Sequence, residues 1–215
     1  MKQLSLRLTI GLIICVGLGL LFFFLTTTFR GDTIPIFDKP MINAIQGLET
    51  PWLTRIMKFF TWIGSEYGVW PITVIAAVLF YYEFKLRRQA ILLIIVVVGS
   101  AILNHFLKMH FKRERPEFHQ LMDVGGYSFP SWHAMLAFSL YVMIAYIAWR
   151  NVKTGLGKFL LILLSAFMII MIGTSRVYLG VHFPSDVIGG LLMSGILVTI
   201  AITIDGHYRE QSGKK

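Results

Sequence analysis

The sequence predicts an all-α membrane protein, a single domain over residues 1–215 in which six transmembrane helices form a bundle. An interfacial helix is expected between the first and second spans. Hydrophobic residues make up 56% of the chain and charged residues only 14%, whereas soluble domains carry about 25% charged residues. The mean hydropathy is +0.70. Runs of about 20 apolar residues recur, and a backbone that crosses lipid satisfies its hydrogen bonds as helices or closed barrels, so runs of this length indicate helices.

The first apolar run, Leu8–Phe29, follows Lys2 and Arg7. A signal peptide is the alternative, but its apolar core would cover roughly 7–15 residues and end at a small-residue cleavage site. This run is longer, and the threonines near its end make a poor cleavage site. We therefore expect a retained transmembrane helix.

Residues 30–65 are mixed in character and contain three prolines, which start helices well and interrupt them badly. Within them, Trp52–Gly64 alternates aromatic and aliphatic residues with polar ones, which is typical of a helix lying in the membrane interface. Five further spans are expected at Tyr67–Tyr82, Ala90–His110, Pro130–Trp149, Phe159–Thr174 and Pro184–Ile204, and Asp205–Lys215 is expected to be a polar tail.

Lysine and arginine number 20 against 11 acidic residues, a net charge of +9. With six spans, the basic clusters at 2–7, 85–88, 150–158 and 209–215 fall on one side of the membrane. By the positive-inside rule that side is cytoplasmic, so both termini of this multi-pass cell-membrane protein are expected there. Basic residues that separate apolar spans argue against nucleic acid as a partner and favour membrane lipids. The single cysteine, Cys15, excludes an intramolecular disulfide and a CxxC motif.

One basic cluster breaks this pattern, because residues 108–115 would lie on the outer side. Two other outer segments, 129–134 and 175–186, hold polar residues that are unusual beside apolar helices. The candidate residues in these three segments are Lys108, Arg115, Ser131, His133, Arg176, His182 and Asp186. A basic cluster on this side indicates an anionic ligand.

His182 and Asp186 are four residues apart, and Pro184 between them is a good helix start, so the two would lie about one turn apart. Asp186 could then accept one ring N–H of His182 and leave the other nitrogen free as a nucleophile or base. Arg176 ends an apolar helix, where a charge needs solvation or a partner. A phosphate suits it as a bidentate partner.

Ser131 is a suitable N-cap for the next helix, whose free N–H groups favour an anion that His133 could also reach. Pro116 disfavours helix at Arg115, so we expect the chain to turn there and Lys108 and Arg115 to converge. Taken singly, such residues are often snorkelling cations, caps or packing histidines. Their combination on one face favours a site that acts on an anion.

The spacing Lys108-x6-Arg115-Pro116, Pro130-Ser131-x-His133 and Ser175-Arg176-x5-His182-x3-Asp186 resembles the three-part signature of the type 2 phosphatidic acid phosphatase family. That family also includes the vanadium haloperoxidases. The motifs cover residues 108–186, and the six-helix layout covers the whole chain. The family usually has glycine between the serine and the histidine. Here that position is Trp132, which keeps the backbone N–H and whose bulk could reshape the pocket or anchor at the interface.

The resemblance implies that His182 attacks phosphorus to form a phosphohistidine, Asp186 orients His182, and His133 protonates the leaving alkoxide. It also implies which groups hold the phosphate oxygens: Lys108, Arg115, Ser131, Arg176 and the amide of Trp132. A phosphoryl transition state spreads charge over three equatorial oxygens, so several fixed donors are needed. No cofactor is implied. No metal-ligand cluster is visible in the sequence, and the basic side chains can take the place of a metal ion.

The short chain most resembles the bacterial B-type phosphatidylglycerophosphatases. We therefore expect a monomer that hydrolyses phosphatidylglycerophosphate to phosphatidylglycerol at the outer face of the membrane. Undecaprenyl diphosphate phosphatase and phosphatidic acid phosphatase remain alternatives, since the motifs do not separate these lipid phosphates. A non-catalytic lipid-binding or flippase-like protein would use the same cations without needing His133 or the His182–Asp186 pair. The haloperoxidases are soluble, and six spans argue against them.

Overall fold

The computed structural model describes residues 2–29, 36–117 and 119–212, and these ranges contain helices and no strand. The helices are α1 Lys2–Thr27, α2 Asp38–Gln46, α3 Pro51–Ile63, α4 Glu66–Val78, α5 Arg87–Phe111, α6 Trp132–Ala148, α7 Gly155–Tyr178 and α8 Pro184–Ser212. A π-helical segment, Leu79–Glu83, continues α4.

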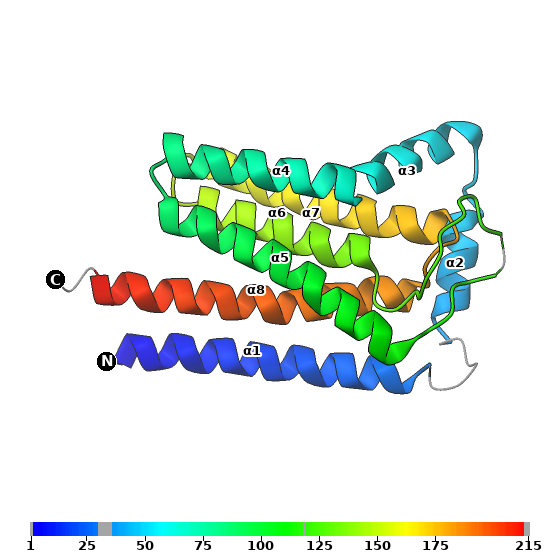
Figure 1. Ribbon diagram of the computed structural model, residues 1–215, viewed down its shortest axis with the longest axis horizontal. Helices are drawn as coiled ribbons and strands as arrows, with labels where there is room; N and C mark the ends of the chain where they lie inside the picture. The colour runs from blue at the N-terminus through cyan, green and yellow to red at the C-terminus, as the bar shows by residue number, and fades with distance from the viewer. Residues whose placement is uncertain (1, 30–35, 118, 213–215) are drawn as a thin grey trace.

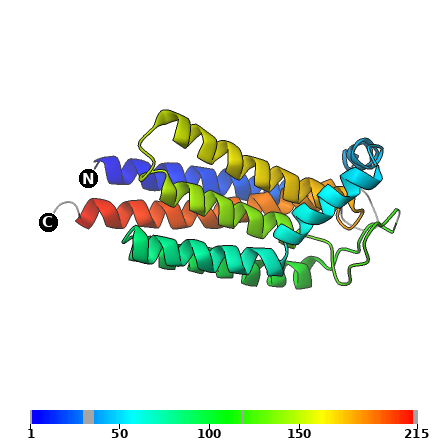
Figure 2. The ribbon, with the colours of Figure 1, turned by 90° about the horizontal axis from the view of Figure 1, so that it is seen from above.

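The long helices run side by side, with both chain ends at one end of the bundle (Figure 1). The opposite end carries α2, α3 and the connection between α5 and α6, and Figure 2 shows the same division. Helix α6 lies in the middle, in contact with α4, α5, α7 and α8, while α1 packs along α8. Buried side chains of α6, among them Met135, Leu136, Leu140 and Met143, belong to the main hydrophobic core.

Four helical segments are long and apolar enough to cross a membrane: Leu6–Thr27, Arg87–Phe111, Gly155–Tyr178 and Pro184–Glu210. Helix α3 and the α4 unit form a pair bent by 53° that together would make a fifth. Helix α6 is apolar but has only 17 residues. The described chain is therefore an all-helical, multi-pass membrane protein.

Each expected apolar span is a helix in the structure, with ends that differ by a few residues. Helix α2 was not predicted. Helix α8 continues to Ser212, so the expectation of a polar tail from Asp205 is wrong for the described part of that tail. The reason is that the Asp205 side chain is fully buried. Its carboxylate accepts a hydrogen bond from the Tyr146 hydroxyl at 2.9 Å and pairs with Arg209 at 2.5 Å and Arg88 at 3.4 Å.

The starts of α6 and α8 approach each other closely because α8 presents two glycines there. A Cβ at Gly190 would lie 2.9 Å from the carbonyl oxygen of Ser131, and one at Gly189 would lie 2.4 Å from the Phe129 ring. Small residues allow helix backbones to pack this tightly in membranes. The Ser131 amide donates to the Asp186 carbonyl at 3.0 Å, which joins two of the three predicted motif segments.

Candidate active site

The three predicted segments meet at the end of the bundle that lies away from the chain termini. Lys108 comes from the last turn of α5, Arg115 from the connection after it, and Arg176 from the last turn of α7. All three are close enough for their charges to act on His182. The charges of Lys108, Arg176 and His182 also act on His133 in the first turn of α6. The side chains that the sequence singled out therefore lie near one another at this end of the bundle.

His182 and Asp186 form the pair that their spacing predicts. Helix α8 begins at Pro184, and the Nδ1 atom of His182 lies 3.2 Å from Oδ2 of Asp186. The same oxygen accepts the amide of Phe183 at 2.9 Å, so it stays fixed beside the ring. His182 is 2% exposed and Asp186 is 0% exposed. This geometry lets Nδ1 donate to the carboxylate and leaves Nε2, which faces Arg115 at 3.3 Å, as the reactive nitrogen.

The environment of His182 keeps its imidazole neutral at physiological pH. Burial holds the pKa of His182 well below its usual value of 6.5, and the positive charges of Arg176, Arg115 and Lys108 lower the pKa further. A neutral imidazole has a free electron pair, which nucleophilic attack requires.

Lys108 and Arg115 approach the site because the chain turns after α5, as expected from Pro116. The helix ends at Phe111, and Lys112 adopts a left-handed conformation with φ of 48°. The guanidinium of Arg115 donates to the carbonyls of Val181 at 2.7 Å and Gly126 at 3.0 Å.

The Nζ atom of Lys108 donates to the carbonyl of Tyr127 at 2.5 Å. Thus the hydrogen-bond acceptors of Lys108 and Arg115 are neutral groups, namely backbone carbonyls and, for Arg115, also Nε2 of His182. Because no carboxylate within the described ranges fixes them, the positive charges of Lys108 and Arg115 remain available to an anion.

Arg176 is the most isolated cation of the site. It is 2% exposed, and its Nη1 atom donates to the hydroxyl of Thr61 in α3 at 2.5 Å. Its Nε atom has no hydrogen-bond partner, and no carboxylate in the described part of the chain pairs with it. A buried guanidinium without a counter-ion is energetically costly. Its position indicates that an anion belongs beside it.

Ser131 precedes α6 as predicted, but its hydroxyl does not cap the helix. The Oγ atom is buried and has no hydrogen-bond partner among the described residues, since the backbone of Ser131 has turned toward Asp186. The hydroxyl is therefore free to bind a ligand. The first amides of the helix, including that of Trp132, have no intrahelical acceptor, so they add further donors.

His133 fits beneath the bend between α3 and α4. Its ring hydrogen-bonds the backbone of Thr61, the residue that also contacts Arg176. A Cβ at Gly64 would lie 3.2 Å from the His133 ring and 2.4 Å from a methyl carbon of Ile172. A glycine at this bend therefore makes room for the histidine. Trp132 is half-buried and packs against the main core.

Sequence reasoning missed a second set of polar residues behind the His182–Asp186 pair. Arg113 donates to Oδ1 of Asp186 at 2.7 Å and pairs with Asp38 of α2 at 3.4 Å. Asp38 accepts hydrogen bonds from the amide of Ser185 at 2.8 Å and from its hydroxyl at 2.5 Å. Burial raises the pKa of Asp38, and the bonds from Ser185 and the charge of Arg113 oppose that shift.

Arg113 also contacts two aromatic rings, with its guanidinium 4.4 Å from the Phe29 centroid and 4.1 Å from that of Phe183. Arg113 belongs to the basic cluster 108–115, but its position in the sequence does not distinguish its role from that of Lys112. Asp38 lies 147 residues before Ser185 in the sequence, so no local pattern predicts their contact.

Residues 89–210 match the family model of the PAP2 superfamily, a range that includes all three motif segments. The chain belongs to the PAP2 superfamily. It is 31% identical over 184 residues to phosphatidylglycerophosphatase B of Bacillus subtilis, and this match covers 85% of this chain and 90% of that relative. It is 27% identical over 182 residues to an undecaprenyl-diphosphatase of Sulfolobus acidocaldarius, with 79% of each chain covered. The resemblance to type 2 phosphatidic acid phosphatases is confirmed.

The PAP2 fold is also seen in solved structures. The crystal structure of a transmembrane PAP2-type phosphatidylglycerolphosphate phosphatase from Bacillus subtilis superposes with a TM-score of 0.81 at 29% identity. The superposition covers 89% of this chain and 96% of that one. The similarity therefore extends beyond the motifs to nearly the whole helical arrangement.

Replacing Arg113 with alanine should leave two buried carboxylates, Asp186 and Asp38, without their shared cation. We expect a loss of about 3–5 kcal/mol of stability, as for other broken buried ion pairs, together with a large loss of turnover. Thermal unfolding in detergent measures the loss of stability, and phosphate release measures the loss of turnover. Lys112→Gln removes an exposed charge next to Arg113 and serves as the control. Equal stability of the two variants would show that Arg113 has no such role.

The pH profile of kcat/KM should fall toward acid as His182 becomes protonated, with its acid limb below pH 6.5 because burial and three cations depress the pKa. Arg115→Gln removes one of those cations, so the pKa rises and the limb should move to higher pH. Arg115→Lys keeps the charge and should keep the limb in place. If both variants titrate at the same pH, the charge of Arg115 does not act on the titrating group.

Proposed function

We propose that the protein hydrolyses the phosphomonoester of phosphatidylglycerophosphate to phosphatidylglycerol through a phosphohistidine intermediate. Membership of the PAP2 superfamily makes it an enzyme, a membrane lipid phosphatase. The observation that carries the chemistry is the buried Arg176, which pairs with no carboxylate of the described residues and whose charge acts on a histidine already oriented by Asp186. Similarity over 85% of the chain to a phosphatidylglycerophosphatase supports the choice of lipid.

In the first step, Nε2 of His182 attacks phosphorus in line with the leaving alkoxide, and the new N–P bond replaces the P–O bond. The Nδ1–H group of His182 keeps its proton and donates a hydrogen bond to Asp186, whose negative charge stabilises the positive charge that develops on the ring. The equatorial oxygens receive charge from Lys108, Arg115 and Arg176. The Ser131 hydroxyl and the first amides of α6 donate hydrogen bonds to the same oxygens. Such fixed donors stabilise a phosphoryl transition state.

In both steps His133 transfers the proton. It protonates the alkoxide as the phosphatidylglycerol product leaves. It then takes a proton from the water that attacks the phosphohistidine, so inorganic phosphate leaves and both residues return to their starting state. Its hydrogen bond to the Thr61 backbone supports this role, because the bond fixes the ring near the cations.

We further propose that the single domain crosses the membrane six times, as α1, the α4 unit, α5, α6, α7 and α8, and acts as a monomer. Helix α3 would lie in the interface, supported by its 53° bend from α4 and by exposed side chains at Trp52, Phe59 and Trp62. Basic residues at the end with the termini support a cytoplasmic location for that end. The candidate active site then opens at the outer face.

Undecaprenyl diphosphate is the second candidate substrate, because the chain also resembles an undecaprenyl-diphosphatase over 79% of its length. Phosphatidic acid is the third, since its phosphomonoester needs the same phosphoryl donors. The arrangement of His133, His182 and Asp186 favours catalysis over a lipid-binding or flippase-like role.

His182→Ala should abolish turnover by several orders of magnitude, because the covalent route is lost. His133→Ala should slow the hydrolysis of an alkyl phosphate much more than that of p-nitrophenyl phosphate, whose leaving group needs no protonation. Steady-state rates in detergent measure both effects. His110→Ala, on the exposed side of α5, is the control. Near-normal turnover by His182→Ala is incompatible with the proposal, and an equal effect of His133→Ala on both substrates removes its role as the acid.

Phosphatidylglycerophosphate should be hydrolysed faster than undecaprenyl diphosphate and phosphatidic acid, and all three much faster than glucose 6-phosphate. A site at the end of the bundle receives a lipid phosphate at headgroup depth. Contacts with acyl groups discriminate by only about 1–3 kcal/mol, so the preference among lipids should be modest. Phosphate release in matched micelles decides this. Equal hydrolysis of the sugar phosphate contradicts a lipid substrate, and a strong preference for undecaprenyl diphosphate selects the second candidate.

A further inference from the structure

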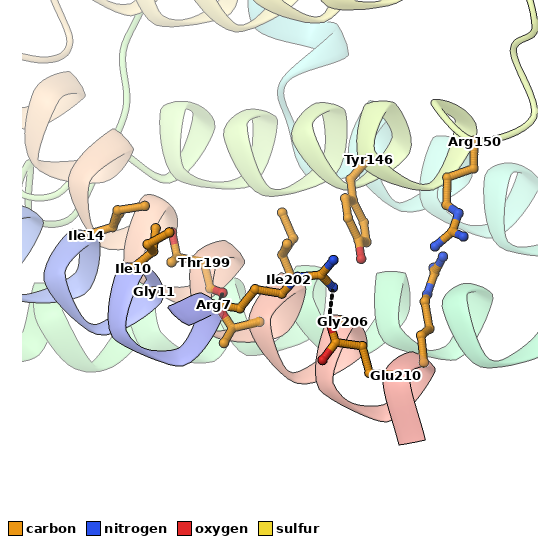
Figure 3. Close-up of a pocket in the computed structure, with 12 residues that line it drawn as sticks. Arg7, Ile10, Gly11, Ile14, Tyr146, Arg150, Thr199, Ile202, Gly206 and Glu210 are labelled. Carbon is orange, nitrogen blue, oxygen red and sulfur yellow. Dashed lines mark hydrogen bonds and ion pairs between the residues drawn. The ribbon is translucent and has the colours of Figure 1, made fainter. Parts of the chain in front are cut away.

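A cavity of about 650 Å³ lies between α1, α6 and α8, at the end of the bundle that carries the chain termini. It is far from the candidate active site and shares no residue with it. Charged residues line one part of it, namely Arg7, Arg150, Arg209 and Glu210, and Ile10 and Ile14 of α1 line another part (Figure 3). No histidine or cysteine is among the lining residues, so the cavity lacks the nucleophile that the candidate active site has.

The charged residues at this end carry more positive than negative charge. Arg7 pairs with Glu210 at 3.0 Å. Both Arg209 and Arg88 pair with Asp205, at 2.5 and 3.4 Å. Three arginines therefore share two carboxylates, and Arg150 adds a further positive charge.

Among the arginines that line the cavity, Arg150 is the one that pairs with no carboxylate of the described residues. It lies exposed just beyond α6 and makes no hydrogen bond or ion pair with the described part of the chain. Figure 3 shows its side chain extending toward α8, at the charged end of the cavity. Its charge acts on Tyr146, which also lines the cavity. An anion between Arg150 and the neighbouring arginines would complete this arrangement.

The opposite part of the cavity is mainly apolar, because Thr199 and Thr203 donate their hydroxyls to backbone carbonyls within α8. Ile10 and Ile14 of α1 lie there, and Figure 3 places both away from Arg150. Ile10 and Ile14 are 47% and 43% exposed, so they offer surface to a ligand. Gly11 brings α1 close to α8 beside them, since a Cβ there would lie 2.6 Å from the Thr203 hydroxyl. A charged end joined to an apolar wall has the chemistry of a phospholipid, with its phosphate at one end and an acyl chain along the other.

We propose that this cavity binds a glycerophospholipid with an anionic headgroup, taken from the leaflet opposite the candidate active site. Arg150 binds the phosphodiester, Arg7 and Arg209 strengthen the positive potential, and one acyl chain lies against Ile10 and Ile14. The cation excess favours a headgroup with net negative charge over a zwitterionic one. The site is independent of the substrate assigned above, because it uses none of the catalytic residues.

Native mass spectrometry of the purified protein in detergent tests this site, with phosphatidylglycerol and phosphatidylcholine of identical acyl chains as probes. Phosphatidylglycerol should bind more tightly than phosphatidylcholine. Arg150→Gln should weaken phosphatidylglycerol binding about tenfold, the effect of losing one charge-assisted bidentate contact. Lys153→Gln removes an exposed charge from the same turn, outside the cavity lining, and should change nothing. Any phosphatidylglycerol in the active site binds all variants alike, and basal turnover in detergent should stay normal.

Ile14→Trp distinguishes a lipid from a free phosphate ion, because the indole fills the apolar part of the cavity and leaves the arginines in place. It should weaken phosphatidylglycerol binding without affecting that of inorganic phosphate. Equal binding of the two phospholipids overturns the headgroup assignment. If Arg150→Gln and Lys153→Gln weaken phosphatidylglycerol binding equally, the effect comes from diffuse surface charge and the proposed site is overturned. Unchanged phosphatidylglycerol binding in Ile14→Trp overturns the acyl contact and leaves the headgroup phosphate as the group that the cavity recognises.

Discussion

The carboxylate of Asp186 is the contact on which the candidate active site depends. One oxygen holds the ring of His182 and the amide of Phe183, and the other accepts Arg113, which reaches on to Asp38 in α2. The backbone carbonyl of Asp186 accepts the amide of Ser131 and so fixes the start of α6. One buried residue therefore joins α2, the connection after α5, α6 and α8. If its charge were not compensated by Arg113, the cost of burying it would oppose the packing that places the histidine.

The arginines of the site divide into two kinds according to what balances them. Arg113 lies against two carboxylates and two aromatic rings, so its charge is used within the protein. Backbone carbonyls hold Arg115 and the hydroxyl of Thr61 holds Arg176, and neither arginine forms an ion pair with a carboxylate in the part of the chain that the structure describes. The site thus gathers positive charge that an anionic ligand would balance. Preorganised charge of this kind is what stabilises a phosphoryl transition state, since the donors need not reorganise during the reaction.

Much of this arrangement was predictable from the sequence because it depends on local spacing. The turn between His182 and Asp186 follows from four residues and a proline, and the convergence of Lys108 and Arg115 follows from the break before Pro116. The partnership of Arg113, Asp38 and Ser185 was not predictable, since it joins segments that are distant in the chain and carry no periodic signal. The extension of α8 past Asp205 was missed for a related reason: an aspartate followed by polar residues is typical of a tail unless its buried partners, Tyr146 and Arg209, are known. Composition indicated a helical membrane protein, but it did not reveal the bend between α3 and α4 that brings Thr61 to Arg176.

A structure of the protein with bound vanadate tests the assignment of His182 most directly, because this oxyanion adopts the trigonal geometry of a transferring phosphoryl group. We expect vanadium bonded to Nε2 of His182, with its equatorial oxygens in contact with Lys108, Arg115 and Arg176 and its apical oxygen facing His133. Vanadium bonded to His133, or vanadate bound away from these cations, would contradict the proposed mechanism.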